Sequence, residues 1–163
     1  MRKKKGFCFL IAGAALCALS SGCLYQPWDG NALKDAAVEL FNDAVEFVGS
    51  CALTGDAWLT GTRKTESDNY NGSYTAEYDR YNGEEYLFGG TSLEPKSSVM
   101  RVGYTLEIKG GSASLCRIGG EEEETIAAVS GEGECELSLE AGDHFIVLKG
   151  ENFTGSLTLT VQT

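Results

Sequence analysis

Short runs of alternating apolar and polar residues fill the chain from Cys51 to its end, and they constrain the fold more than any other feature. Leu157, Leu159 and Val161, for example, alternate with polar residues. A two-residue period puts all the apolar side chains of a strand on one face, which can then cover a core. Gly, Asn, Asp and Ser separate the runs, as tight turns require. The sequence therefore predicts a mainly β fold, an antiparallel β-sandwich over residues 50–163.

Ten strands are predicted, at residues 52–54, 57–63, 74–81, 84–88, 100–109, 112–118, 125–130, 135–139, 144–149 and 156–161. Asn82 and Gly83 tolerate the positive φ values of a type I′ turn, so the strands on either side of them are expected to form a hairpin. Three apolar faces are expected in the core: Tyr104, Leu106 and Ile108; Cys135, Leu137 and Leu139; Leu157, Leu159 and Val161. Residues 121–124, all glutamates, are expected in an exposed loop.

The first 22 residues have the layout of a secretory signal. Residues 2–5 are all basic, residues 7–19 form an apolar run, and small residues follow. The apolar run is shorter than the roughly 20 residues that a membrane-spanning helix needs. We therefore expect an export signal.

The segment 19–23, Leu-Ser-Ser-Gly-Cys, resembles the lipobox of bacterial lipoproteins, with Ser20 at the position where Leu is commonest. The resemblance implies that residues 1–22 are removed and that the Cys23 thiol carries a diacylglyceryl group, with a further acyl chain such as palmitate on the new N-terminus. These lipids would hold the protein on the extracytoplasmic face of a membrane. Two alternatives are cleavage near Gly22, which gives a freely secreted protein, and retention of the signal as a membrane helix.

A spacer at residues 23–30 and an amphipathic helix at residues 31–49 are predicted between the signal and the β domain. Asn31 can cap the helix and Gly49 can end it. Its apolar residues recur at helical spacing: Leu33, Ala37, Leu40, Phe41, Ala44, Val45 and Val48. We expect this stripe to pack on the β domain; the alternative is a partner protein.

The charge of the chain excludes two kinds of partner. Four of its 13 basic residues lie in the signal, so nine would remain against 24 acidic residues, which gives the mature chain a net charge of −15. Nucleic acid is bound through Lys and Arg, and an anionic lipid surface attracts the same residues. We therefore expect neither partner.

Three cysteines, Cys51, Cys116 and Cys135, follow the lipidated one. The expected disulfide joins Cys116 and Cys135; in a reducing habitat all three would remain thiols. No Cys-x-x-Cys or Cys/His spacing is present, so no metal and no cofactor besides the covalent lipid is expected.

Residues 139–150 and 153–161 resemble the closing strands of bacterial prepeptidase C-terminal and related jelly-roll-like sandwich domains. In that family a Gly-containing turn precedes an apolar strand, and a Gly opens the last alternating strand. The resemblance implies a jelly-roll type of sandwich and a non-catalytic accessory module. It transfers no functional residue.

Aromatic residues give a second hypothesis. Rings on a sheet face can stack on sugars, so Trp58, Tyr74, Tyr78 and Tyr86 are candidates for a glycan platform; the alternative is that they fill the core. His144 is the sole histidine, and Asp143 beside it would point to the opposite face, so we expect a half-exposed strand residue and no catalytic relay. The expected function is a non-catalytic interaction module of the envelope, with a carbohydrate-binding module as the alternative and a hydrolase as a third hypothesis. The sequence leaves the oligomeric state open.

Overall fold

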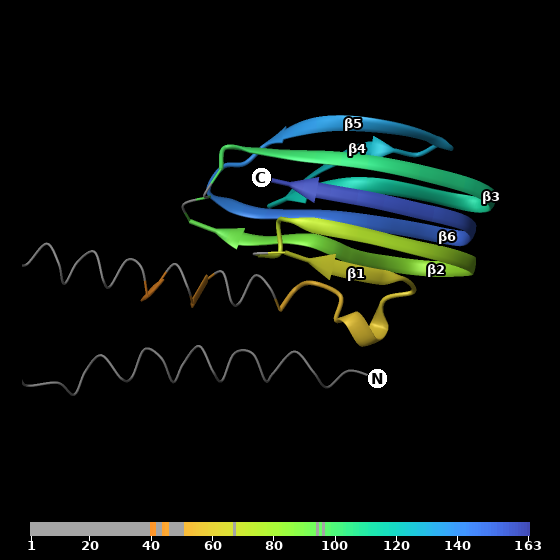
Figure 1. Cartoon of the computed structure of the whole chain (residues 1–163), viewed down its shortest axis with the longest axis horizontal. Coiled ribbons are helices and arrows are strands. Elements are labelled where there is room, and N and C mark those ends of the chain that lie inside the picture. Colours follow the sequence, from red (N-terminus) through yellow and green to blue (C-terminus); the bar gives the residue numbers. More distant parts are fainter. Residues whose placement is uncertain (1–39, 42–43, 46–50, 67, 94, 96) are drawn as a thin grey trace, which may run out of the picture.

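The structure, a computed structural model, describes residues 40–41, 44–45, 51–66, 68–93, 95 and 97–163 (Figure 1). A short 3-10 helix, η2 (Asp56–Trp58), precedes the strands β1 (Thr62–Thr65), β2 (Gly72–Ser92), β3 (Val99–Gly119), β4 (Glu122–Ala127), β5 (Gly131–Ser138) and β6 (Gly142–Gln162). Every strand pair is antiparallel. The predicted mainly β, antiparallel structure is therefore confirmed.

Three long strands form the centre of the fold. β2, β3 and β6 are each 21 residues long and lie side by side in the order β2-β6-β3. All three bend back at the same end of the molecule (Figure 1), where their pairing becomes irregular. Gly111 makes one of these bends, because its φ is 70° and a Cβ there would lie 2.1 Å from the carbonyl oxygen of Asn152. Each long strand thus contributes one arm to each of two layers.

The two layers are defined by the pairing of these arms. The five-strand layer contains β1, residues 72–81, residues 153–162, residues 99–108 and β5, in that order. The four-strand layer contains residues 83–92, residues 142–150, residues 112–119 and β4. The arrangement is sandwich-like, with β5 and β4 at the same side of their layers.

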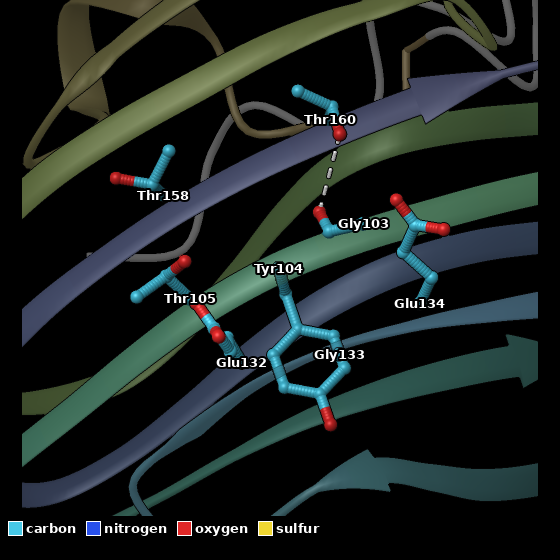
Figure 2. A pocket seen from close by; sticks show the side chains of 8 residues that line it. All are labelled: Gly103, Tyr104, Thr105, Glu132, Gly133, Glu134, Thr158 and Thr160. Carbon is cyan, nitrogen blue, oxygen red and sulfur yellow. Dashed lines mark hydrogen bonds between the residues drawn. The ribbon is translucent and has the colours of Figure 1, made fainter.

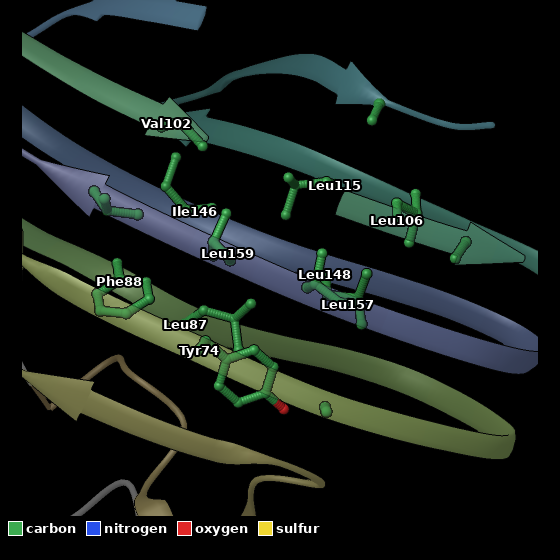
Figure 3. Close-up of a cluster of buried hydrophobic side chains, with 14 of the residues drawn as sticks. Tyr74, Leu87, Phe88, Val102, Leu106, Leu115, Ile146, Leu148, Leu157 and Leu159 are labelled. Carbon is green, nitrogen blue, oxygen red and sulfur yellow. The ribbon is translucent and has the colours of Figure 1, made fainter. Parts of the chain in front are cut away.

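The hydrophobic core lies between the layers and takes residues from both arms of each long strand (Figure 3). The three predicted apolar faces are confirmed: six of their nine residues are buried, and Tyr104, Ile108 and Cys135 are partly buried against the core. The opposite positions of the same strands face outward, because side chains alternate along a strand.

The predicted hairpin around Asn82 and Gly83 is wrong. Residues 74–81 and 84–88 both belong to β2, but they pair with β6 and not with each other. The reason is that both arms carry apolar residues that need burial. As arms of opposite layers, they bring Tyr74 and Leu87 to the same core from two sides.

Other predicted elements need correction or lie outside the described residues. The predicted strands at 52–54 and 57–63 are replaced by η2, irregular backbone and β1, and three of the glutamates expected in a loop lie in β4. The signal peptide, the spacer and most of the predicted helix lie outside the described residues. Within the range of that helix, Leu40, Phe41, Ala44 and Val45 are described and are helical.

A buried carboxylate, that of Glu85, lies in the core near the bend of β2. The side chain of Glu85 is 2% exposed, and its oxygens accept four hydrogen bonds. Oε2 accepts from the hydroxyls of Tyr74 at 2.8 Å and Tyr78 at 2.7 Å. Oε1 accepts from the backbone N–H and the hydroxyl of Thr60, both at 2.7 Å. The two tyrosine oxygens lie 3.0 Å apart, and the N–H of Gly61 donates to that of Tyr74. The cluster joins both layers to the segment before β1.

Burial and the negative charge of Glu85 keep these tyrosines protonated. Burial is the main cause that raises the pKa of Tyr78 and of Tyr74 far above the usual 10.0, and the hydrogen bonds to Glu85 raise both further. Tyr81, at the margin of the core, has its pKa raised to about 12 by burial and by the charges of Glu85 and Glu84.

We expect Tyr78→Phe to lower the free energy of unfolding by about 1–3 kcal/mol, because it removes one donor from a buried carboxylate. Urea unfolding followed by circular dichroism measures this. Tyr86→Phe is the matched control, since Tyr86 is half-buried on the other side of β2 and its loss of a hydroxyl should have little effect. Equal stability of the two variants would contradict the role given to the Glu85 cluster.

Alkaline pH should unfold the domain through the same tyrosines. The pKa of each tyrosine is higher in the folded state than in the unfolded state, where it is 10.0. The stabilisation that these protonated hydroxyls give the fold is therefore complete below pH 10.0 and is lost as the pH rises above it. We expect the free energy of unfolding to fall by roughly 1.4 kcal/mol per pH unit for each such tyrosine. Urea titrations above and below this pH would show a shallower fall for Tyr78→Phe than for the unaltered chain.

Candidate functional site

The outer face of the five-strand layer is polar over residues 101–107 of β3 and the strand segments paired with them. Because Tyr74, Ala76 and Tyr78 point to the core, their neighbours point outward, and the other strands follow the same alternation. The outward positions are Thr62, Lys64, Ser73, Thr75, Glu77, Asp79, Arg101, Gly103, Thr105, Glu107, Glu132, Glu134, Glu136, Ser156, Thr158, Thr160 and Gln162. Hydroxyls and carboxylates therefore dominate this face.

Strand register aligns many of these side chains in rows across the layer. One row consists of four threonines and a glutamate, each paired with the next: Thr62, Thr75, Thr158, Thr105 and Glu132. All five are exposed. The next row is Lys64, Ser73, Thr160, Gly103 and Glu134. Neighbouring strands lie roughly 4.8 Å apart, so the hydroxyls of a row form a continuous line of donors and acceptors.

A hollow of about 620 Å³ lies where these two rows meet β5 (Figure 2). Its lining consists of Gly103, Tyr104, Thr105, Glu132, Gly133, Glu134, Thr158 and Thr160. Gly103 opens it, because a glycine leaves a gap in a row of side chains; a Cβ there would lie 2.8 Å from the hydroxyl oxygen of Thr160. A second hollow of about 490 Å³ shares Gly103, Glu134 and Thr160 and continues toward Arg101 and Glu136. Together they form what we call the polar groove.

Charge along the polar groove is uneven. At one end Arg101 Nε lies 2.8 Å from Glu136 Oε1, and this carboxylate raises the pKa of the guanidinium. Glu107 pairs with Lys109 at 3.0 Å, next to the groove. Among the described residues, no cation forms an ion pair with Glu132 or Glu134. The middle of the groove is therefore negative and can accept hydrogen bonds or a cation.

The aromatic residues predicted as a glycan platform do not share a face, so that platform is wrong. Tyr74 and Tyr78 are 0% and 3% exposed in the core, where their hydroxyls donate to the buried Glu85. Tyr86 is half-buried on the outer face of the four-strand layer, with its ring edge-on to Phe145 at 5.6 Å. Trp58 alone among the four is exposed, at 76%, and it lies in η2.

The predicted disulfide is also contradicted. Cys116 and Cys135 are both thiols in the structure. Cys116 is buried in the four-strand layer, whereas Cys135 lies in β5 of the five-strand layer against the core. Similar spacing in the sequence therefore does not bring them together. Burial raises the pKa of both thiols.

His144 is buried at 5% exposure, not half-exposed as predicted. Arg117 Nη2 lies 3.0 Å from its Nδ1, and its Nε2 lies 2.9 Å from the carbonyl oxygen of Glu140. The guanidinium can only donate, so Nδ1 accepts from it; the backbone N–H of Glu140 also faces Nε2, at 3.2 Å. Asp143 accepts a hydrogen bond from Thr91, so it does not orient His144. The imidazole fastens the turn before β6 to β3.

In the described part of the chain, no group of three or more His, Cys, Asp or Glu residues is placed to hold a metal ion. No helix among these residues combines the length and the apolarity needed to cross a bilayer.

The sequence reasoning missed the polar groove and the Glu85 cluster. The threonines of the groove are the polar half of the same alternation that identified the core, so Thr158 and Thr160 could have been read as an outward row. The strand register that aligns them with Thr75 and Thr105 was not visible in the sequence. Glu85 carried no signal, because it sits among other acidic and aromatic residues that resemble a surface strand.

No protein-family model matches the chain, and no curated protein matches it. Among solved structures, the chain is similar to a carbohydrate-binding module (CBM6cm-2) from Cellvibrio mixtus lichenase 5A in complex with cellotriose, with 14% identity, a TM-score of 0.34, and coverage of 64% of this chain and 87% of that one. It is also similar to Drosophila melanogaster CENP-C bound to CAL1, with 12% identity, a TM-score of 0.31, and coverage of 80% and 99%. The function therefore has to be inferred from the residues of the chain itself.

Proposed function

We propose that the chain is a bacterial envelope lipoprotein, held on the extracytoplasmic face of a membrane by lipids on Cys23. Support comes from the sequence: a basic segment, a short apolar run and a cysteine after small residues. The described domain would then be displayed outside the cytoplasm. The alternating arms of the three long strands support a jelly-roll type of β-sandwich for this domain.

The displayed domain is a non-catalytic binding module, and the polar groove is its binding surface. The observation that carries this proposal is the gap at Gly103 in an otherwise continuous outward row, which hollows a face built on paired strands. Side chains on such strands are held in fixed positions, so the groove offers an ordered set of hydrogen-bonding groups. The chemistry of its lining is that of recognition by hydrogen bonds and charge.

A carbohydrate ligand is the second candidate, favoured by the chemistry of the groove itself. Thr105, Thr158 and Thr160 can donate and accept, and the carboxylates of Glu132 and Glu134 accept strongly from hydroxyl groups. Such a lining fits a neutral or amine-bearing glycan better than an acidic one, because the groove is negative. This candidate does not use the tyrosines of the core.

Replacing the lipidated cysteine tests the anchor. We expect Cys23→Ala to leave the protein unprocessed or released from the membrane, because no thiol remains to carry the diacylglyceryl group. Membrane fractionation and mass spectrometry of the N-terminus measure this. The unaltered chain found in the culture medium without lipid, beginning after residue 23, would overturn the anchoring proposal.

Filling the hollow tests the groove. We expect Gly103→Leu to weaken binding of ligands found on a glycan array by about tenfold or more, because the new side chain occupies the space between Thr160 and Glu134. Calorimetric titration measures the affinity. Gly131→Leu is the matched control, since a side chain there meets nothing within 4 Å. Both variants should keep the unfolding midpoint; equal affinity of the two would rule out the groove as the site of glycan binding.

A further inference from the structure

β5 is an edge strand whose second side is unpaired. Within the described part of the chain it pairs with β3 alone, from Val99 with Ser138 to Leu106 with Gly131. Among the described residues, no backbone hydrogen bond reaches residues 132–137 from the opposite side. Alternate N–H and C=O groups of this strand therefore point to solvent, which is the arrangement on which another strand can add.

The two faces of β5 differ sharply in chemistry. Glu132, Glu134 and Glu136 point outward at every second position and form one wall of the polar groove. On the inner face, Cys135 and Leu137 pack against the core, and the Tyr104 ring lies beside Gly133, where a Cβ would be 2.8 Å from its hydroxyl. Tyr104 and Cys135 are only partly buried, so the core is incompletely covered along this edge.

The charges of β5 select what can pair with it. Cross-strand neighbours have Cβ atoms roughly 5 Å apart, close enough for opposite charges to attract and for like charges to repel. A second copy of this chain would place its own glutamates against these three, so pairing between copies is disfavoured. A strand with Lys or Arg at alternate positions would instead neutralise Glu132 and Glu134, which have no ion-pair partner among the described residues.

We propose that β5 is the docking site for an extended segment of a partner protein, which adds to the free edge as a further strand. This segment carries basic residues at every second position, facing the glutamates, and apolar residues between them, which cover Tyr104 and Cys135. Backbone hydrogen bonds provide the attachment, and the charges provide the selection. The proposal rests on the proposed role of the domain as a binding module and names its partner class.

Synthetic octapeptides of alternating Lys and Val, titrated into the full lipidated chain in nonionic detergent, test this proposal. We expect binding, together with slowed hydrogen exchange at amides of residues 132–137, because solvent-facing N–H groups become paired. The Glu-Val octapeptide should not bind. Two further Lys-Val peptides carry N-methyl groups, one on every Lys amide and the other on every Val amide. One of the two should bind at least tenfold more weakly than the unmethylated peptide, because its methyl groups remove the N–H donors that face β5.

The double variant Glu132→Gln/Glu134→Gln should weaken binding of the Lys-Val peptide about tenfold, since it removes two cross-strand charge pairs. Glu121→Gln/Glu122→Gln is the matched control, because it removes the same charge from the turn after β3 and the first residue of β4, away from β5. Equal binding of both N-methylated peptides, or unchanged exchange at β5, would show attraction by charge alone and overturn strand addition. The peptide would instead bind in the groove if Gly103→Leu abolished its binding and if, in the unaltered chain, the peptide left hydrogen exchange at β5 unchanged. If a glycan binds and the peptide does not, strand addition at β5 is wrong, whereas the proposal that the domain is a binding module is retained.

Discussion

The buried carboxylate of Glu85 links the two layers of this domain to each other and to the segment before β1. A carboxylate in a core requires donors, and the nearest ones are the hydroxyls of Tyr74 and Tyr78 and the segment at Thr60. These contacts connect the two arms of β2 across the core in which both arms bury their apolar residues, and they tie the chain before β1 to it. The hydroxyls of Tyr74 and Tyr78 are thereby held inside the domain. The outer face of the five-strand layer is consequently left to threonine, serine and glutamate.

The proposed binding features follow from this division of inside and outside. With the rings of Tyr74 and Tyr78 in the core, recognition on the outer face of the five-strand layer has to use hydroxyls, carboxylates and backbone edges. Gly103 leaves room for the hollow in this face. The glutamates of β5 make the hollow negative, and they also lie along the free edge of the strand. On an edge strand, charge limits unselective pairing, and the same charge makes pairing with a complementary strand selective. The polar groove and the free edge are therefore two parts of one surface.

The sequence predicted the β content and the core faces well, because a two-residue period directly reports which side of a strand is buried. It failed where pairing mattered. The Asn82–Gly83 pair has the chemistry of a hairpin turn, but the flanking residues pair with β6, a strand far away in the chain. The same limitation explains the disulfide: Cys116 and Cys135 are nineteen residues apart and lie in different layers. Local patterns do not encode which strand lies beside which.

By itself, the sequence predicted an export signal with a candidate lipid site, and it determined the excess of negative charge, the strand-rich composition and the inward faces of the strands. These depend only on residue type and on spacing within a few positions. Only the tertiary structure decided that the three long strands bend together, that Tyr74 and Tyr78 serve a buried glutamate, and that four threonines from four strands line up beside Glu132. Those outcomes depend on register between distant segments, which is set when all strands satisfy their hydrogen bonds and bury their apolar faces at once.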